Sequence, residues 1–457
     1  MIYIRITDIQ NAAVVIFSNE MAYSLLRRYK SRYMSFFDWK KWFQGNVSSV
    51  KCLWIFVIFF IVGSGLICLI ERENQYNTAT EYMTHHIKFE NDNNVVETAT
   101  GIESLSQLNA RYALLMDAKN RRVLYEKSGY EKVPMASTTK IMTLMIALEN
   151  GNLDDMVTVS SYAAKMPKVH LGMKADEQYR LGDLLYSMML ESHNDSAVAI
   201  AEHIGGSVEG FAQLMNEKAK ELGAYNTNFV TPNGIDADGH YTTAYDLALI
   251  SSYAIENEKI LEIINTPSYS FHEQTKGRVF TVNNKDRFLN SYSGAIGIKT
   301  GFTGKAGYCF VGAAKRDEKQ LISVVLASGW PPNKNYKWKD TTALMNYGME
   351  NFSEKEVLKE GTSFQKIPVT DSIENRPVTP YVEENVSLLL SEDDKVDFDI
   401  ELPKMLAAPI KKHQTLGKIT ISVNDNIYKV LPLYADEPRT QITYFYVLKK
   451  IFYQYIT

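Results

Sequence analysis

An uncharged stretch of 18 residues, Leu53–Ile70, limits how the rest of this chain can fold. A run of this length can cross the hydrocarbon core of a bilayer as a helix. Lys and Arg are frequent between residues 27 and 51, whereas the flank beyond the stretch, Glu71-Arg72-Glu73, is not basic. This asymmetry predicts a cytoplasmic N-terminus, with everything after the stretch outside. We therefore expect a cytoplasmic segment over 1–52 and a transmembrane anchor or uncleaved signal over 53–70.

A cleaved signal peptide is the alternative for this stretch. Its apolar region is long for a signal, and no small-x-small cleavage site follows it. Leu66 and Ile67 precede Cys68, where a lipid-attachment site would need small residues. A retained anchor is therefore the favoured interpretation.

The composition is that of an ordinary folded protein. The chain has 457 residues, of which 45% are hydrophobic and 22% charged, and its net charge is −4. A slightly acidic chain gives no support to nucleic-acid binding, which favours basic surfaces. Cys52 and Cys68 fall in or beside the apolar stretch, so only Cys309 remains for the body. We therefore expect neither a disulfide within the body nor a cysteine metal site.

Residues 71–105 are rich in Asn, Glu and Thr and lack periodic hydrophobicity, which is typical of a solvated, flexible stalk. The next region, 106–352, has strand patterns at both ends, beginning with a hairpin at 112–125, and helix patterns between them. This order predicts an α+β domain in which one antiparallel sheet, built from both ends of the domain, is flanked by helices. The expected helices are 181–190, 196–204, 210–222, 243–255 and 341–349, and the expected later strands are 297–302, 308–314 and 321–327.

The character of the chain changes again near residue 356. Alternating hydrophobic stretches and an Asn424-Asp425-Asn426 turn predict a small all-β domain over 356–436. The last residues, 440–457, place aromatic and aliphatic side chains on one helical face, opposite Lys449 and Lys450. This pattern is typical of an amphipathic helix that lies in the membrane interface. A last core helix of the β domain is the alternative.

Ser137 and Lys140 lie one helical turn apart at the start of a strongly apolar helix pattern. A buried lysine loses hydration, its pKa falls, and it can then act as a base on a neighbouring serine hydroxyl. The pair alone is weak evidence, because Ser48 and Lys51 show the same spacing where no such chemistry is expected. A capping serine and a solvent-reaching lysine would be the simpler interpretation of an isolated pair.

Two further motifs follow in the same domain. Ser192-His193-Asn194 comes after an apolar helix pattern, and Lys299-Thr300-Gly301 lies within a strand pattern. Each would be a polar loop or a strand end if it stood alone. The order Ser-x-x-Lys, Ser-x-Asn and Lys-Thr-Gly resembles the serine penicillin-recognising enzymes. Longer stretches resemble the D-alanyl-D-alanine carboxypeptidases among them, the low-molecular-mass penicillin-binding proteins: 136–143, 187–203, 231–246, 298–308 and 406–417.

The resemblance implies a β-lactamase/transpeptidase-like catalytic domain followed by the small β domain. It also implies a serine-type carboxypeptidase that trims the terminal D-alanine from peptidoglycan stem pentapeptides. Ser137 would form the acyl-enzyme, and Lys140, kept neutral by burial and nearby positive charge, would take its proton. Ser192 would relay a proton towards the leaving amine, and Asn194 would orient Lys140 and the substrate amide.

The same resemblance assigns the substrate-binding residues. The backbone N–H groups of Ser137 and Phe302 would form the oxyanion hole. Lys299, which would stay charged, and Thr300 would meet the terminal carboxylate of the substrate, and Gly301 would let the peptide lie along the strand edge. No metal or other cofactor is implied. β-Lactams would be covalent inhibitors, and the catalytic domain would act on the extracytoplasmic face of a bacterial cell membrane.

Some residues depart from the family pattern, and two other functions compete. Where relatives often use an arginine for the carboxylate, this chain offers Lys337 or Lys334, and a lysine gives a point charge in place of a fork. His193 is expected to be a surface or packing residue. A β-lactamase would need a Glu-x-x-x-Asn loop, which is absent between Asn194 and Lys299. A membrane-anchored β-lactam sensor would need a larger intracellular partner domain than residues 1–52 supply.

Overall fold

The computed structural model describes residues 82–89 and 105–456. The described residues fall into two units, one over 82–441 and one that contains the C-terminal segment from Ile442. The predicted cytoplasmic segment and anchor lie outside the described residues. Among the residues that are described, no helix is both long and apolar enough to cross a membrane.

A five-stranded antiparallel sheet organises the first domain, and its strand order is β3-β2-β10-β9-β8. The first hairpin and the three later strands were expected, so both ends of the domain build this sheet, as predicted. β8 is an edge strand, which matters for the site. The strands are β2 Tyr112–Asp117, β3 Val123–Lys127, β8 Ala295–Thr303, β9 Gly307–Arg316 and β10 Lys319–Leu326.

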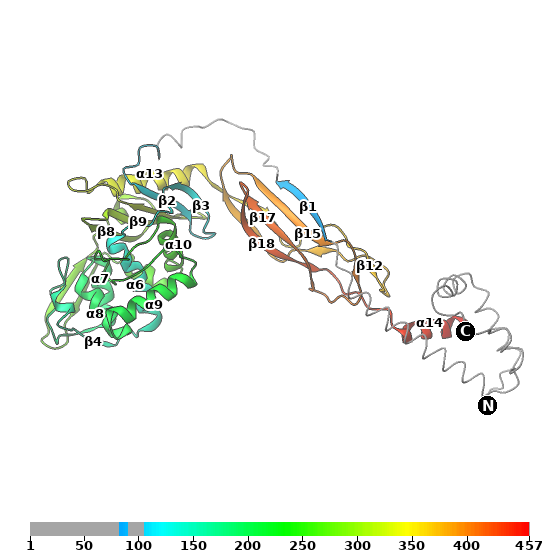
Figure 1. Ribbon diagram of the computed structural model, residues 1–457, viewed down its shortest axis with the longest axis horizontal. Coiled ribbons are helices and arrows are strands. Elements are labelled where there is room, and N and C mark those ends of the chain that lie inside the picture. The colour runs from blue at the N-terminus through cyan, green and yellow to red at the C-terminus, as the bar shows by residue number, and fades with distance from the viewer. Residues whose placement is uncertain (1–81, 90–104, 457) are drawn as a thin grey trace, which may run out of the picture. The chain divides into compact units, whose positions relative to one another are not determined.

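The two faces of the sheet pack against two different hydrophobic cores, because successive residues of a strand point to opposite faces. Leu114 and Met116 join the large helical core, whereas Ala113 and Leu115 pack under the last helix of the domain. Figure 1 shows this last helix, α13, and the helix α10 at the sheet. The expected helices are confirmed, and α11 and α12 were not foreseen. The helices are α6 Lys140–Asn150, α7 Leu181–Leu190, α8 Asn194–Gly205, α9 Val208–Glu221, α10 Ala244–Ala254, α11 Glu258–Asn265, α12 Phe288–Ser291 and α13 Tyr336–Asn351.

Two small hairpins and two short 3₁₀ turns complete this domain. The turn η1 directly precedes α6, and the turn η2 directly precedes the loop over residues 166–174. The sequence analysis did not foresee these hairpins. The strands β4 and β5 have three residues each, too few for a recognisable alternation, whereas β6 does alternate polar and aromatic residues. These elements are η1 Ala136–Thr139, η2 Ala163–Lys165, the hairpin β4 Met156–Thr158 with β5 Gln178–Arg180, and the hairpin β6 Ser268–His272 with β7 Val279–Asn283.

The C-terminal region is all-β, as expected, with a core of alternating Val, Ile and Leu residues. Asn424 and Asp425 have φ of 51° and 63°, so they form the left-handed turn for which Asn and Asp are suited. This turn joins β17 and β18. The strands are β11 Ser353–Leu358, β12 Val369–Thr370, β13 Pro380–Tyr381, β14 Val386–Leu390, β15 Val396–Pro403, β16 Leu406–Ala407, β17 Thr415–Val423 and β18 Asn426–Ala435.

One expectation is wrong for part of the predicted stalk. Residues Tyr82–Phe89 form strand β1, which pairs antiparallel with β15 at the edge of the C-terminal sheet (Figure 1). This strand was not predicted, because an edge strand can be held by main-chain hydrogen bonds without a hydrophobic pattern of its own. The final helix, α14, spans Tyr444–Ile456, and its aromatic residues Phe445 and Phe452 are exposed.

Candidate active site

The side chains of Ser137 and Lys140 meet at the start of α6. Ser137 lies in η1, and the Lys140 Nζ atom is 2.9 Å from its Oγ atom. Ala136, immediately before the serine, has φ of 50°, a region in which a non-glycine residue is strained. The tight turn presents Ser137 half-buried, while Lys140 behind it is fully buried. The predicted serine–lysine pair is therefore in hydrogen-bond contact.

Lys140 is held by neutral acceptors and not by a carboxylate. Its Nζ atom is 2.9 Å from Oδ1 of Asn194 and 2.5 Å from the carbonyl oxygen of Asn233. Burial, and next the charge of Lys299, set the pKa of Lys140 well below its usual value, whereas Asp195 acts in the opposite direction. Lowering the pKa of an amine favours its neutral form, which is the form that can accept a proton. This agrees with the role of base expected for Lys140.

The second motif lies between α7 and α8, as the sequence predicted. Ser192 follows the end of α7 with φ of 68°, and Asn194 is the first residue of α8. The Asn194 amide Nδ2 donates to the carbonyl of Pro167 at 3.2 Å, and its backbone N–H donates to the carbonyl of Val169 at 2.8 Å. Asn194 is thus fixed on both sides, with its Oδ1 turned to Lys140.

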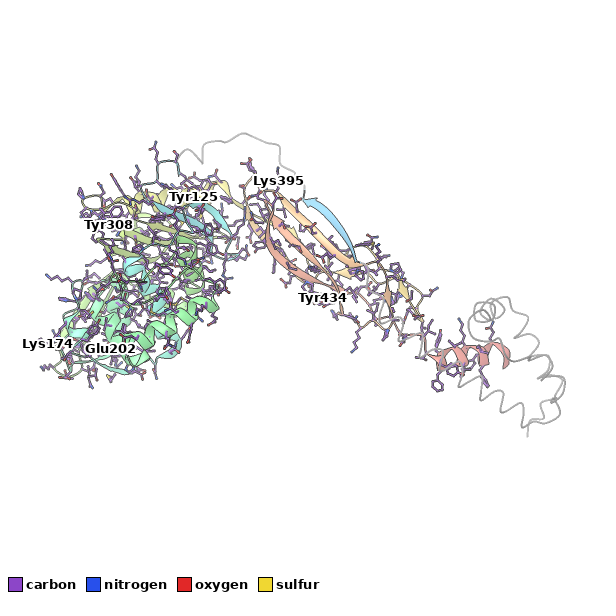
Figure 2. All side chains as sticks on the ribbon, viewed as in Figure 1. Tyr125, Lys174, Glu202, Tyr308, Lys395 and Tyr434 are labelled. Carbon is purple, nitrogen blue, oxygen red and sulfur yellow. The ribbon has the colours of Figure 1, made fainter. Side chains whose placement is uncertain are left out.

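The third motif lies on the edge strand β8, which packs against η1. A Cβ atom added to Gly301 would be 3.0 Å from the Ser137 backbone nitrogen and 3.1 Å from Ala136 Cβ. Glycine is therefore needed at position 301 so that the strand can approach the serine turn. This is a second reason for glycine here, besides the expected one of letting the peptide lie along the strand edge. Phe302 is exposed, and its ring is 4.6 Å from that of Tyr308, which is labelled in Figure 2.

Lys299 is buried beside Lys140, and this alters one expectation. Burial, together with the charge of Lys337, lowers the pKa of Lys299 to about 7, with Asp286 acting in the opposite direction. We expected Lys299 to stay charged, but in the free pocket its proton is held only weakly at neutral pH. A substrate carboxylate would raise its pKa again.

Lys337, on α13, is the better of the two lysines considered for the carboxylate. Its Nζ atom is 5.6 Å from the ring centre of Tyr308 and 4.8 Å from that of Trp338. Burial lowers its pKa to about 8, and its charge acts on Lys299. Lys334 is exposed.

His193 is a packing residue, as expected. It is 4% exposed, its Nδ1 atom is 2.9 Å from Ser187 Oγ, and its Nε2 atom is 3.4 Å from Oε2 of Glu191. Burial lowers its pKa, so the ring is neutral at pH 7. Its contacts connect the end of α7 to the motif loop.

Sequence reasoning missed Asn233, whose main chain supports both Ser137 and Lys140. The Ser137 hydroxyl is 3.3 Å from the Asn233 carbonyl oxygen, and Thr143 Oγ1 donates to the neighbouring Pro232 carbonyl at 2.6 Å. Gly234 follows with φ of 81°, and a Cβ atom there would lie 2.0 Å from the Ala136 carbonyl oxygen. The Pro-Asn-Gly turn was the only signal.

Within the described ranges, no group of three or more His, Cys, Asp or Glu residues converges as metal ligands would.

Comparisons with known proteins agree with this geometry. The family model described as D-alanyl-D-alanine carboxypeptidase matches residues 95–329, and that of the penicillin-binding protein 5 C-terminal domain matches 352–441. D-alanyl-D-alanine carboxypeptidase DacF of Bacillus subtilis is 30% identical over 349 residues, which cover 75% of this chain and 88% of DacF.

Solved structures give the same result. Penicillin-binding protein 5 from Haemophilus influenzae matches with a TM-score of 0.62 at 27% identity, covering 73% of this chain and 98% of that chain. D-alanyl-D-alanine carboxypeptidase DacD from Francisella tularensis matches with a TM-score of 0.60 at 25% identity, covering 77% and 97%. Fold and site together define a serine hydrolase with a transpeptidase-like catalytic domain and a C-terminal β domain. The chain belongs to the D-alanyl-D-alanine carboxypeptidase family, so the expected family and enzyme class are confirmed.

Proposed function

We propose that this protein removes the terminal D-alanine from peptidoglycan stem peptides through an acyl-enzyme on Ser137. The observation that carries the proposal is the contact of the buried Lys140 amine with both the Ser137 hydroxyl and the Asn194 amide oxygen. Lys140 takes the hydroxyl proton as the Ser137 Oγ atom bonds to the carbonyl carbon between the two D-alanines. The carbon–nitrogen bond then breaks, and the leaving amine receives a proton relayed by Ser192. Water later hydrolyses the ester and restores Ser137.

Binding of the peptide uses the strand edge. The backbone N–H groups of Ser137 and Phe302 donate to the developing oxyanion, which they stabilise more strongly than the ground-state carbonyl. Lys299 and Thr300 bind the terminal carboxylate, and Lys337 adds a second positive charge there. A carboxylate in this place binds best when Lys299 is protonated. The β-lactam antibiotics carry a carboxylate and a reactive amide, so they acylate the same serine and block it.

We further propose that the catalytic domain faces the outside of a bacterial cell membrane. The uncharged stretch 53–70 and the basic residues before it support an anchor with this orientation. The helix α14 supports a second membrane contact, because its exposed aromatic residues suit the interfacial region of a bilayer. The segments 1–52, 71–105, 106–352, 356–436 and 440–457 keep the roles given to them from the sequence, apart from the strand β1.

The test is D-alanine release by the full-length protein in detergent from a peptide ending in D-Ala-D-Ala. We expect release and labelling by fluorescent penicillin, both lost in Ser137→Ala. Ser48→Ala is the matched control, because it changes the other Ser-x-x-Lys pair and should keep both signals. Penicillin labelling without D-alanine release would instead indicate a β-lactam sensor. Fast penicillin hydrolysis would indicate a β-lactamase.

A further inference from the structure

The loop over residues 166–174 contacts Asn194 through its main chain. The carbonyl oxygens of Pro167 and Val169 receive the two hydrogen bonds of Asn194 described above, at 3.2 Å and 2.8 Å. The Pro167 carbonyl orients the side-chain amide of Asn194, and the Val169 carbonyl holds its backbone N–H. The position of this loop therefore determines where the Asn194 oxygen meets Lys140.

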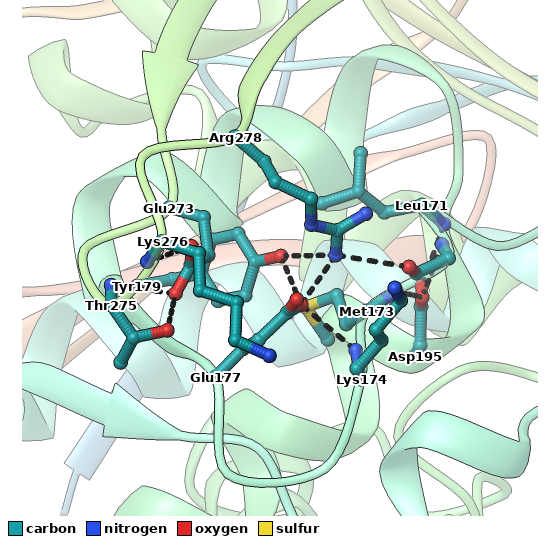
Figure 3. Close-up of polar contacts among 11 residues, drawn as sticks. Leu171, Met173, Lys174, Glu177, Tyr179, Asp195, Glu273, Thr275, Lys276 and Arg278 are labelled. Carbon is teal, nitrogen blue, oxygen red and sulfur yellow. Dashed lines mark hydrogen bonds and ion pairs between the residues drawn. The ribbon is translucent and has the colours of Figure 1, made fainter.

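Asp195, the residue after Asn194, holds the next part of the loop. Its carboxylate accepts the backbone N–H groups of Leu171 and Gly172, each at 2.9 Å, and of Met173 at 3.2 Å. The side chain is 1% exposed, so these charge-assisted hydrogen bonds are shielded from water. Figure 3 shows Asp195 facing this run of backbone nitrogens.

Arg278 holds the same loop from the opposite side, and it comes from the hairpin β6–β7. Its guanidinium donates to the Gly172 carbonyl at 3.2 Å and to the Tyr179 hydroxyl at 3.3 Å, and it forms an ion pair with Glu177 (Figure 3). The Glu177 carboxylate, 2% exposed, also accepts the backbone N–H of Lys174 at 2.9 Å. Arg278 and Glu177 together bind the C-terminal end of the loop.

We propose that Arg278 is a positioning residue for acyl transfer and acts with Asp195 through the 166–174 loop. Arg278 and Asp195 clamp Gly172 between them, and this fixes the Pro167 and Val169 carbonyls that hold Asn194. Asn194 in turn holds the Lys140 amine against Ser137. This inference rests on the proposed function, because it concerns the rate at which Ser137 is acylated. A hairpin outside all three motifs thereby sets the geometry of the base.

The experiment measures acylation of the full-length protein by fluorescent penicillin, with the labelled fraction and the rate constant recorded separately. The labelled fraction at saturation counts folded sites, and the rate constant reports their geometry. We expect Arg278→Ala to keep most of the labelled fraction while its acylation rate constant falls about 10- to 100-fold, as displaced catalytic groups do. Arg278→Lys keeps the positive charge but loses the planar guanidinium that bonds several acceptors at once. Its rate constant should therefore lie between those of wild type and Arg278→Ala.

Arg121→Ala is the matched control. Arg121 also pairs with a glutamate, Glu256, and lies over an aromatic ring, Tyr253, as Arg278 lies over Phe280. It has no contact with the loop, so its rate constant should equal that of wild type. Glu177→Gln should slow acylation, and adding Arg278→Ala should slow it little further, because both changes release the same end of the loop.

Two results would overturn the inference. One is an Arg278→Ala rate constant within about twofold of wild type, because a 10- to 100-fold loss is expected of a displaced group. The other is a loss of labelled fraction with an unchanged rate constant, which would give Arg278 a structural role alone. Failure of the proposed function itself would appear separately, as continued labelling of Ser137→Ala.

Discussion

Gly301 and Ser137 approach so closely that a single added methyl group would lie 3.0 Å from the serine backbone nitrogen. This nitrogen is one of the two proposed oxyanion donors. The strand that receives the substrate and the turn that carries the nucleophile are thus in direct main-chain contact. Any change in their separation alters the distance between nucleophile and oxyanion donors.

Gly301→Ala is therefore expected to slow acylation by about 10- to 100-fold, because the turn must shift to admit the methyl group. The strain should also lower the free energy of unfolding by about 1–3 kcal/mol. Penicillin acylation rates and urea unfolding measure the two effects. Gly304→Ala is the control, since a Cβ atom there would have no heavy atom within 4 Å. Equal rates in the two variants would contradict the prediction.

Lys140→Arg should remove activity although it keeps the positive charge. Arginine remains protonated at any pH that a protein tolerates, so it cannot accept the Ser137 proton. Loss of a general base lowers rates by about 100- to 10,000-fold. Lys51→Arg, in the other Ser-x-x-Lys pair, should have no effect on D-alanine release. A Lys140→Arg variant with substantial activity would show that another group is the base.

Peptide binding should weaken as the pH rises above 7. The pKa of Lys299 is about 7, and only its protonated form attracts the substrate carboxylate. In Ser137→Ala, where no reaction follows, we expect the Kd of a D-Ala-D-Ala peptide to rise by up to about tenfold per pH unit above that value. Calorimetric titration from pH 6 to pH 9 measures this, and a constant Kd would contradict it.

Lys337→Met tests the origin of the low Lys299 pKa. Removing the Lys337 cation removes a repulsion, so the pKa of Lys299 should rise and the weakening of binding should move to higher pH. Binding at pH 6 should become weaker, because one attractive charge is lost. Lys334→Met, three residues earlier and exposed, should leave both the Kd and its pH dependence unchanged. Identical profiles for the two variants would exclude Lys337 from the carboxylate site.

Acid should destabilise the serine turn through His240. The His240 Nδ1 atom accepts the backbone N–H of Val230 at 3.0 Å, so Nε2 carries the proton and faces Thr139 Oγ1 at 3.0 Å. Burial lowers the pKa of His240 to about 4 from a usual 6.5. Between pH 4 and pH 6.5, His240 is therefore protonated in the unfolded chain but neutral in the folded chain. The contribution of the neutral His240 to the free energy of unfolding is fully present above pH 6.5. It is lost as the pH falls towards 4, and the loss amounts to roughly 3 kcal/mol.

Urea unfolding at pH 7 and at pH 4 measures this loss. His240→Gln should reduce the difference between the two pH values, because glutamine does not titrate. His272→Gln, at an exposed position, should keep the difference of the wild type. An undiminished difference in His240→Gln would assign the acid sensitivity to other groups.

The sequence predicted those features that depend on local pattern. The hairpin at 112–125, the strands of the sheet and the serine at a helix start follow from periodicity and turn residues close in the chain. The three motifs then met as expected, because each lies at the end or edge of such an element. The proposed roles of their residues remain predictions.

What the sequence could not predict depends on distant contacts. The Asn233 carbonyl reaches Lys140 through the path of the main chain, which no side-chain type reveals. The low pKa of Lys299 depends on burial and on Lys337, which α13 brings to the site. Arg278 belongs to the hairpin β6–β7, and its contacts with Gly172 and Glu177 join segments more than 100 residues apart in the sequence. In each case the tertiary fold, and not the local pattern, determines the role.

The strand β1 has a consequence for how the protein is made. Its partner β15 is synthesised only after the whole catalytic domain. The C-terminal sheet is therefore discontinuous in the sequence. During translation, β1 cannot pair with β15 until the whole catalytic domain has been synthesised. A chain that stops early leaves this strand without a partner, so the pairing of β1 with β15 marks a polypeptide that has been translated through its β domain.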